Sequence, residues 1–199
     1  MFTQNGVMGI SVWKPQLIVT LTPLVTVVGI VGWLLAPPRL AFLLCSVAAS
    51  VNFIRWLGWK PWRCVKQPMV WVLQLGYLWI PMTFLCMGLQ SMGFVSRSLP
   101  MHALAVGAMG LIIAGMITRT AMGHTGRPIS ASPIETTLFS LIAISGISRA
   151  CAAIPLFQTP DITPVLLMLS ATAWAFGFAL YVYRYTPWLF RPRLDGKPG

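Results

Sequence analysis

Long apolar runs, separated by short polar connections, dominate the pattern of this chain. A helix needs about 20 apolar residues to cross a bilayer. Windows of that length lie at 16–36, 38–55, 69–92, 101–121, 134–154 and 164–185. The connections contain residues that end helices, such as Pro37 and Pro38 after the first window. The pattern predicts an all-α fold, a polytopic transmembrane helical bundle of about six spans.

Composition supports a membrane protein and leaves no room for a separate soluble domain. Of the 199 residues, 57% are hydrophobic and 9% are charged, whereas about a quarter of the residues in a soluble domain are charged. The net charge of +11 could suggest nucleic acid, but the basic residues lie between apolar runs and form no stripe on a soluble surface. We therefore expect a single integral membrane domain over residues 1–199 that binds no nucleic acid.

The basic residues orient the bundle, because short cytoplasmic loops collect Lys and Arg. An up-and-down arrangement puts eleven of them on one side: Lys14, Arg55, Lys60, Arg63, Lys66, Arg119, Arg127, Arg184, Arg191, Arg193 and Lys197. The other side has only Arg39 and Arg97, together with the acid Asp161. The asymmetry predicts that both termini are cytoplasmic.

Few polar side chains lie within the spans, and each is a candidate for function because burying it in lipid is costly. They are Asn52, Gln74, Glu135 and Arg149. Glu135 follows Ser132 and Pro133 with the spacing of a capping box, which indicates a helix start. Arg149 either extends to the outer interface or holds an anion such as a carboxylate. No Ser-His-Asp set or carboxylate pair supports a hydrolase.

The fourth span carries a strip of small residues between two histidines. Ala103, Gly107, Gly110 and Ala114 share one helix face, where another helix or a flat ligand can approach closely. His102 and His124 are 22 residues apart, which is on the order of 33 Å in a continuous helix. They cannot share a metal, so each is either a helix-end residue or a ligand completed by another helix or chain.

A basic group follows the same span on the cytoplasmic side. Arg119, His124 and Arg127 accompany Gly123 and Gly126 just before the next helix. This is either an anion-binding corner or a positively charged glycine turn that only sets topology.

Three strings in and after this span resemble the NnrS family: His-Ala-Leu-Ala-Val-Gly from His102, Met-Ile-Thr-Arg-Thr from Met116 and Gly-His-Thr-Gly-Arg-Pro from Gly123. The tryptophan-rich segment from Arg55 to Trp79 is also similar. The resemblance implies a bacterial inner-membrane protein that binds haem and copper and acts in the response to nitric oxide and nitrosative stress. Members are usually about twice as long, and this chain resembles their carboxyl-terminal half from roughly residue 16 onward.

The resemblance also implies site residues. The positions that match are Thr118, Thr125 and Gly126, with His102, His124, Arg119 and Arg127 as the cofactor-binding set. His102 and His124 would be haem or copper ligands or their close supports, and a haem propionate is an anion that Arg149 could hold. Beyond the lipid bilayer, the expected partner is a separate subunit corresponding to the amino-terminal half, or a second copy of the chain. Whether the protein is an enzyme stays open.

Two other functions fit the residues. A half-size membrane transporter would use six helices around a site in the middle of the membrane, and Pro23 and Pro81 could break its helices. A non-catalytic membrane assembly subunit would need no site.

Overall fold

The computed structural model describes residues 13, 15–194 and 196, and Lys14 and Lys197 lie outside the described residues. Among the described residues there are helices and turns but no strand. Six helical segments are long and apolar enough to cross a membrane: α1 (Gln16–Leu35), α2 (Pro38–Gly58), α3 (Pro68–Ser91), the segment Ser98–His124, α6 (Pro133–Cys151) and α7 (Ile162–Leu189). The predicted all-α transmembrane bundle is confirmed, and the protein is a multi-pass membrane protein.

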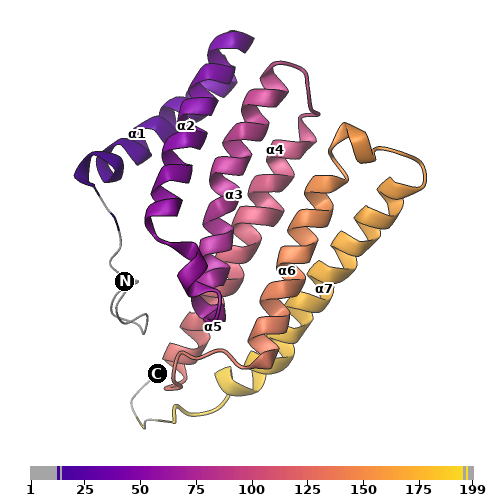
Figure 1. The fold of residues 1–199 in the computed structure, drawn as a ribbon. Coiled ribbons are helices and arrows are strands. Elements are labelled where there is room, and N and C mark those ends of the chain that lie inside the picture. Colours follow the sequence, from indigo (N-terminus) through magenta and orange to yellow (C-terminus); the bar gives the residue numbers. More distant parts are fainter. Residues whose placement is uncertain (1–12, 14, 195, 197–199) are drawn as a thin grey trace.

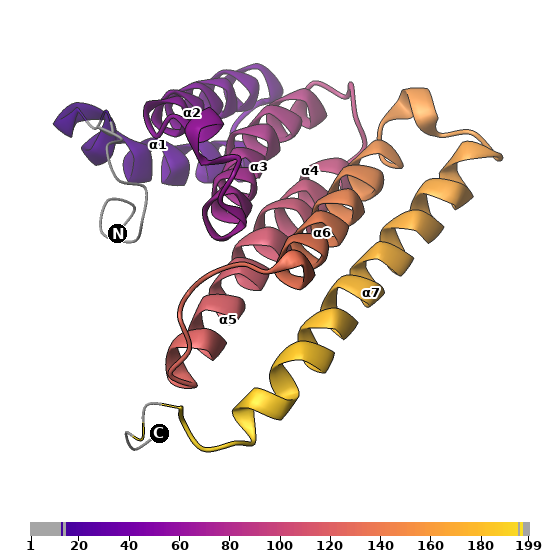
Figure 2. The same cartoon turned by 60° about the horizontal axis from the view of Figure 1, so that its bottom comes forward.

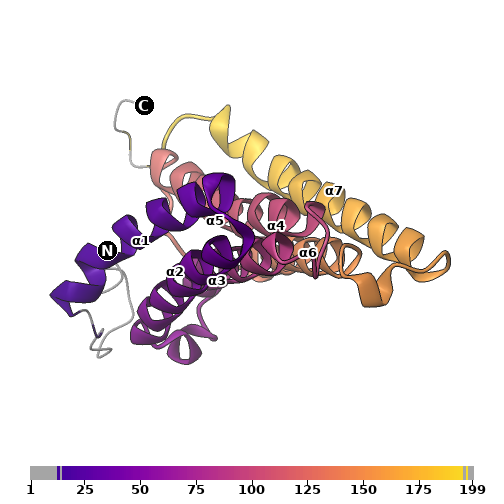
Figure 3. The ribbon, with the colours of Figure 1, turned by 90° about the horizontal axis from the view of Figure 1, so that it is seen from above.

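The spans pack mainly against their neighbours in the chain, from α1 at one side of the bundle to α7 at the other (Figure 1). In the view from above, α1 and α7 lie on the outside, and α3, α6 and the fourth span lie between them (Figure 3). The main core lies where these three central spans meet, and α7 covers part of it. Its fully buried side chains include Val72, Leu111, Phe139, Ile142 and Tyr185.

Proline and glycine set the helix boundaries that the sequence predicted. Pro38, Pro68 and Pro133 each begin a span, where the fixed φ of proline suits the first turn and its missing N–H is not needed. Gly126 ends the fourth span with φ +72, a left-handed conformation that is easy only for glycine. These signals are local, so the predicted and observed boundaries agree within a few residues.

The fourth span is not the continuous α-helix that its sequence pattern predicts. It consists of α4 (Ser98–His102), a π-helical segment η2 (Ala103–Met109) and α5 (Gly110–His124). A π segment has i→i+5 hydrogen bonds, which accommodate one extra residue in the helix, and it is frequent at functional sites. It begins directly after His102, so this histidine marks the point at which the helix changes its winding.

The connections divide into two groups at opposite ends of the bundle. The short helix η1 (Pro61–Cys64), the end of α5 and the end of α7 lie at one end, whereas the turn between α3 and α4 and the short helix η3 (Pro155–Phe157) lie at the other (Figures 1 and 2). The first end carries most of the basic residues, including Arg55, Arg63 and Lys66. We call it the basic end, and the other the η3 end.

Candidate functional site

His102 and Arg149 form a pair at the η3 end. Arg149, near the end of α6, places its Nη2 atom 2.6 Å from Nε2 of His102. A guanidinium only donates hydrogen bonds, so His102 Nε2 is the acceptor. His102 is therefore neutral, with its ring proton on Nδ1. The two residues are 47 positions apart in the chain, and no local pattern in the sequence predicts that they meet.

An open groove of about 470 Å³ surrounds the pair. Its walls come from the fourth span, α6 and α7, and its other lining residues are Val106, Ser145, Leu167, Ser170, Ala171 and Trp174. Ser145 and Ser170 donate to each other's carbonyl oxygens at 2.8 and 3.0 Å. Their hydroxyls are thus used to join α6 to α7. Of the residues that line the groove, His102 and Arg149 are the ionisable ones that a ligand could engage.

Close packing fixes the backbone that follows His102. A Cβ atom added to Gly107 would lie 2.4 Å from the Trp79 ring, and one added to Gly146 would lie 3.0 Å from the Cα atom of Gly107. Trp174 packs against Gly110 in the same way. The predicted strip of small residues is buried, and two tryptophans and α6 pack against its glycines. The strip therefore positions the wall of the groove and does not itself form a ligand surface.

The other candidate residues lie at the basic end and have separate neighbours. Arg119 donates from Nη2 to the carbonyl oxygen of Met69, whereas the guanidinium of Arg127 lies 4.2 Å from the centre of the Trp188 ring. His124 is exposed in the last turn of α5. The structure therefore does not gather Arg119, His124 and Arg127 around one centre, although it places all three at the same end of the bundle.

Two of the polar residues within spans have structural roles. Glu135 forms the predicted capping box with Ser132 and also accepts a hydrogen bond of 2.9 Å from Tyr185 on α7. Asn52 donates to Thr26 and to the carbonyl oxygen of Ala48, and its Oδ1 accepts from Tyr77. Because these groups are satisfied within the fold, neither residue is left for a ligand.

A metal site made by the described residues alone would need ligands that lie close together. Within this part of the chain, no three His, Cys, Asp or Glu side chains cluster in a way that could hold a metal ion. Cys64 lies outside the spans in η1, and burial raises the pKa of its thiol. It therefore offers less of the thiolate form that metals prefer. A site with one histidine as protein ligand, as haem can have, is compatible with the structure; a copper site with several ligands needs further donors.

Comparison with known proteins decides the family. The model of the NnrS family, described as NnrS protein, matches residues 1–193. The chain belongs to the NnrS family. The match includes the histidine motifs around His102 and His124 and extends further toward the amino terminus than the resemblance from residue 16 that was expected. No curated protein matches this NnrS chain. No solved structure matches it either.

Proposed function

We propose that this NnrS chain is a haem- and copper-associated protein of the bacterial inner membrane that acts in the response to nitric oxide and nitrosative stress. Membership of the family supports this function in general. The observation that carries the proposal is the groove at the η3 end, where His102 lies beside Arg149.

The residues of the groove fit a haem. A haem bound between helices needs an axial histidine and an apolar pocket. His102 would supply a nitrogen ligand, while Val106, Leu167 and Trp174 would supply apolar wall. Arg149 would hold a propionate, because a guanidinium pairs strongly with a carboxylate. When bound, the haem iron would supply the coordination position at which nitric oxide can bind.

Arg149 has two possible partners in this proposal, and only one can be held at a time. In the structure, Arg149 Nη2 donates a hydrogen bond to His102 Nε2 and so engages the lone pair of that nitrogen. Ligation through that nitrogen requires Arg149 to turn away, which frees its guanidinium for a carboxylate. When a haem binds, His102 and Arg149 would therefore both change partner. Neither the positive charge of Arg149 nor the lone pair of His102 Nε2 would be left without a partner.

Copper fits this chain less well. His124 is exposed at the basic end, and the described residues provide no group of three ligands there. We propose that copper ligation by His124, with Arg119 and Arg127 as supports, requires donors from a partner. That partner is a separate subunit corresponding to the amino-terminal half of a longer family member, or a second copy of this chain.

Recovery from nitric oxide tests the proposed role. In a bacterium whose own copy of the gene is deleted, we expect the wild-type chain to shorten the growth delay after a pulse of nitric oxide. His102→Ala should abolish this protection, whereas Gln158→Leu, at an exposed position beyond η3, should keep it. Immunoblots should show that the wild-type and variant chains are present in equal amounts. Equal recovery with and without the chain would contradict the proposed role. It would favour a half-size transporter or a non-catalytic assembly subunit, and substrate uptake would test the transporter.

A further inference from the structure

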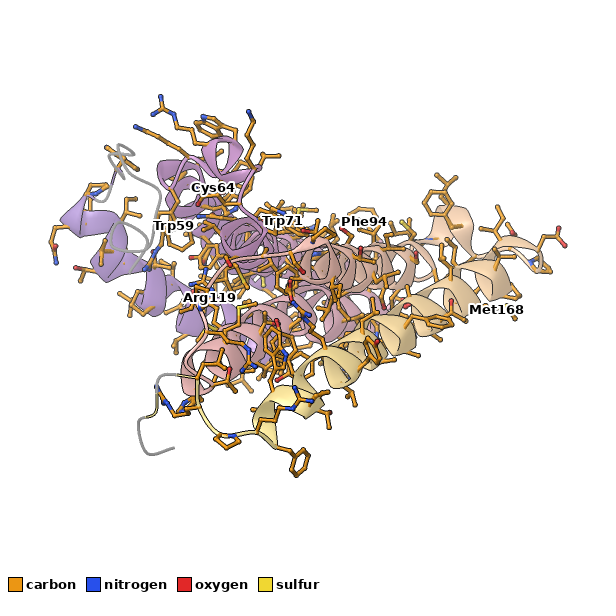
Figure 4. All side chains as sticks on the ribbon, turned by 90° about the horizontal axis from the view of Figure 1, so that it is seen from below. Trp59, Cys64, Trp71, Phe94, Arg119 and Met168 are labelled. Atoms are coloured by element: carbon orange, nitrogen blue, oxygen red, sulfur yellow. The ribbon has the colours of Figure 1, made fainter. Side chains whose placement is uncertain are left out.

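A pocket of about 280 Å³ lies at the basic end, where α3 begins. Three parts of the chain line it: the residues before and in the first turn of α3, Arg119 of the fourth span, and the connection between α5 and α6. Figure 4 shows Arg119 in the same region of the bundle as Cys64 of η1 and Trp71 of α3. Among the described residues that line the pocket, Lys66 and Arg119 are cationic and none is acidic.

The guanidinium of Arg119 is held at the wall of this pocket. Its Nη2 atom donates to the carbonyl oxygen of Met69 in the first turn of α3, and both residues line the pocket. Arg119 is partly buried, and its Nε atom has no hydrogen-bond partner among the described residues. A hydrogen bond to a neutral carbonyl group fixes the guanidinium in place but does not neutralise its charge.

No carboxylate of the described residues balances this charge. The acids in that part of the chain are Glu135 and Asp161. Glu135 pairs with Arg184 at 3.4 Å, and Asp161 lies in the connection between α6 and α7 at the η3 end. A cation that is taken out of water without a counter-ion is costly. The pocket is therefore suited to an anion that comes from outside the described residues.

Topology alone does not explain this arrangement. Exposed cations such as Arg63 are enough to mark the cytoplasmic side. Arg127 is partly buried as Arg119 is, but its guanidinium lies 4.2 Å from the centre of the Trp188 ring. Arg119 differs because it shares a pocket with a second cation, Lys66, which comes from another part of the chain.

The donors in the pocket fit a phosphate group. The guanidinium fork of Arg119 matches the geometry of phosphate oxygens, and the ammonium group of Lys66 adds a second positive charge. Ser130 lines the same pocket and carries a hydroxyl group that can donate. Because a span begins here with α3, the pocket lies at the level of the lipid headgroups, where phosphates are concentrated.

We propose that this pocket binds a phosphate group, supplied either by the headgroup of an anionic phospholipid or by free phosphate. Arg119 and Lys66 would contact its oxygens from two sides, and Arg119 would keep its hydrogen bond to Met69. This binding does not depend on the haem proposed at His102, which lies at the other end of the bundle, and His124 does not line the pocket.

Calorimetric titration of the chain in dodecyl maltoside micelles tests the proposal, with empty micelles as the blank. We expect saturable binding of dioctanoyl phosphatidylglycerol and none of dioctanoylglycerol, which lacks the phosphate. Lys66→Gln and Arg119→Gln should each weaken the binding about tenfold or more, which corresponds to about 1.4 kcal/mol. Lys66 is exposed, so its substitution tests the site without disturbing the packing of the helices.

Sodium phosphate is the second probe and distinguishes the two sources. If it displaces the bound lipid, or binds saturably where the lipid does not, the pocket takes free phosphate. If it does not compete, the pocket takes the lipid headgroup. Each of these results supports a phosphate site, provided that Lys66→Gln weakens the binding observed.

Arg63→Gln is the matched control, because Arg63 is an exposed cation of η1 that does not line the pocket. It should bind as the wild-type chain does, and so should His102→Ala. Arg119→Lys, which keeps the charge, should bind more tightly than Arg119→Gln. Absence of saturable binding for both phosphate probes would overturn the proposal. Equal weakening by Arg63→Gln and Lys66→Gln would also overturn it, because it would show attraction to the basic surface in general.

Discussion

At the scale of single residues, the partners of the polar side chains within the spans separate structural roles from candidate functional ones. Glu135 could be assigned from sequence because a capping box involves residues only three positions apart. The pairing of Arg149 with His102 could not, because it joins two helices 47 positions apart. The lack of a hydrogen-bond partner for Gln74 Oε1 among the described residues could not be predicted either, because it depends on which side chains the fold brings near it.

Arg149→Met tests the role of the guanidinium in the groove. We expect about tenfold weaker binding of haem, because a charge-assisted hydrogen bond to a buried carboxylate contributes about 1.5–3 kcal/mol. Binding of haem dimethyl ester, which has no carboxylate, should be unchanged or tighter, since Arg149 no longer occupies His102 Nε2. Optical titration of the detergent-purified protein measures the affinity for haem and for its dimethyl ester.

Arg97→Met is the matched control, because Arg97 is an exposed arginine near the same end of the bundle. It should bind both compounds as the wild-type chain does. If Arg149→Met weakened the two compounds equally, the variant would have damaged the groove as a whole, and the assignment of Arg149 to a propionate would be wrong.

At the scale of elements, the spans could be predicted and the winding of the fourth span could not. Span limits follow from local hydropathy and from prolines and glycines, as at Pro133 and Gly126. The π segment Ala103–Met109 instead depends on tertiary packing, in which Gly107 meets Trp79 and Gly146. A sequence pattern read at 3.6 residues per turn contains no sign of that extra residue.

Gly107→Ala tests whether this packing holds the segment. We expect the variant to be destabilised by about 1–3 kcal/mol, the usual cost of overpacking, because the new methyl group overlaps the Trp79 ring. Thermal unfolding of the detergent-purified proteins measures this loss of stability. Gly123→Ala is the control, since nothing lies within 4 Å of a Cβ atom there; alanine should stabilise that helical turn by up to about 1 kcal/mol. Equal melting temperatures for the two variants would contradict the close packing.

At the scale of the whole molecule, charge and hydropathy together predict how the bundle sits in the membrane. The described basic residues of the connections gather at one end, while Arg39, Arg97 and Asp161 lie toward the other. The helices that lie outermost, α1 and α7, expose many apolar side chains, as expected for helices in contact with lipid. The groove around His102 and Arg149 would then lie near the periplasmic face.

Reporter fusions test this orientation. A green fluorescent protein joined after Gly199 should fluoresce, because it folds in the cytoplasm, and alkaline phosphatase at the same position should be inactive. Phosphatase inserted after Thr159, in the connection between α6 and α7, should be active. The reverse pattern would place the basic end outside and would contradict the assignment of the termini to the cytoplasm.

The absorption spectrum of the detergent-purified chain, with metal analysis, tests the central proposal most directly. We predict a Soret band with haem close to one per chain, lost in His102→Ala and retained in His124→Ala. A wild-type chain that is folded yet colourless and free of metal would contradict a haem site built by these residues alone.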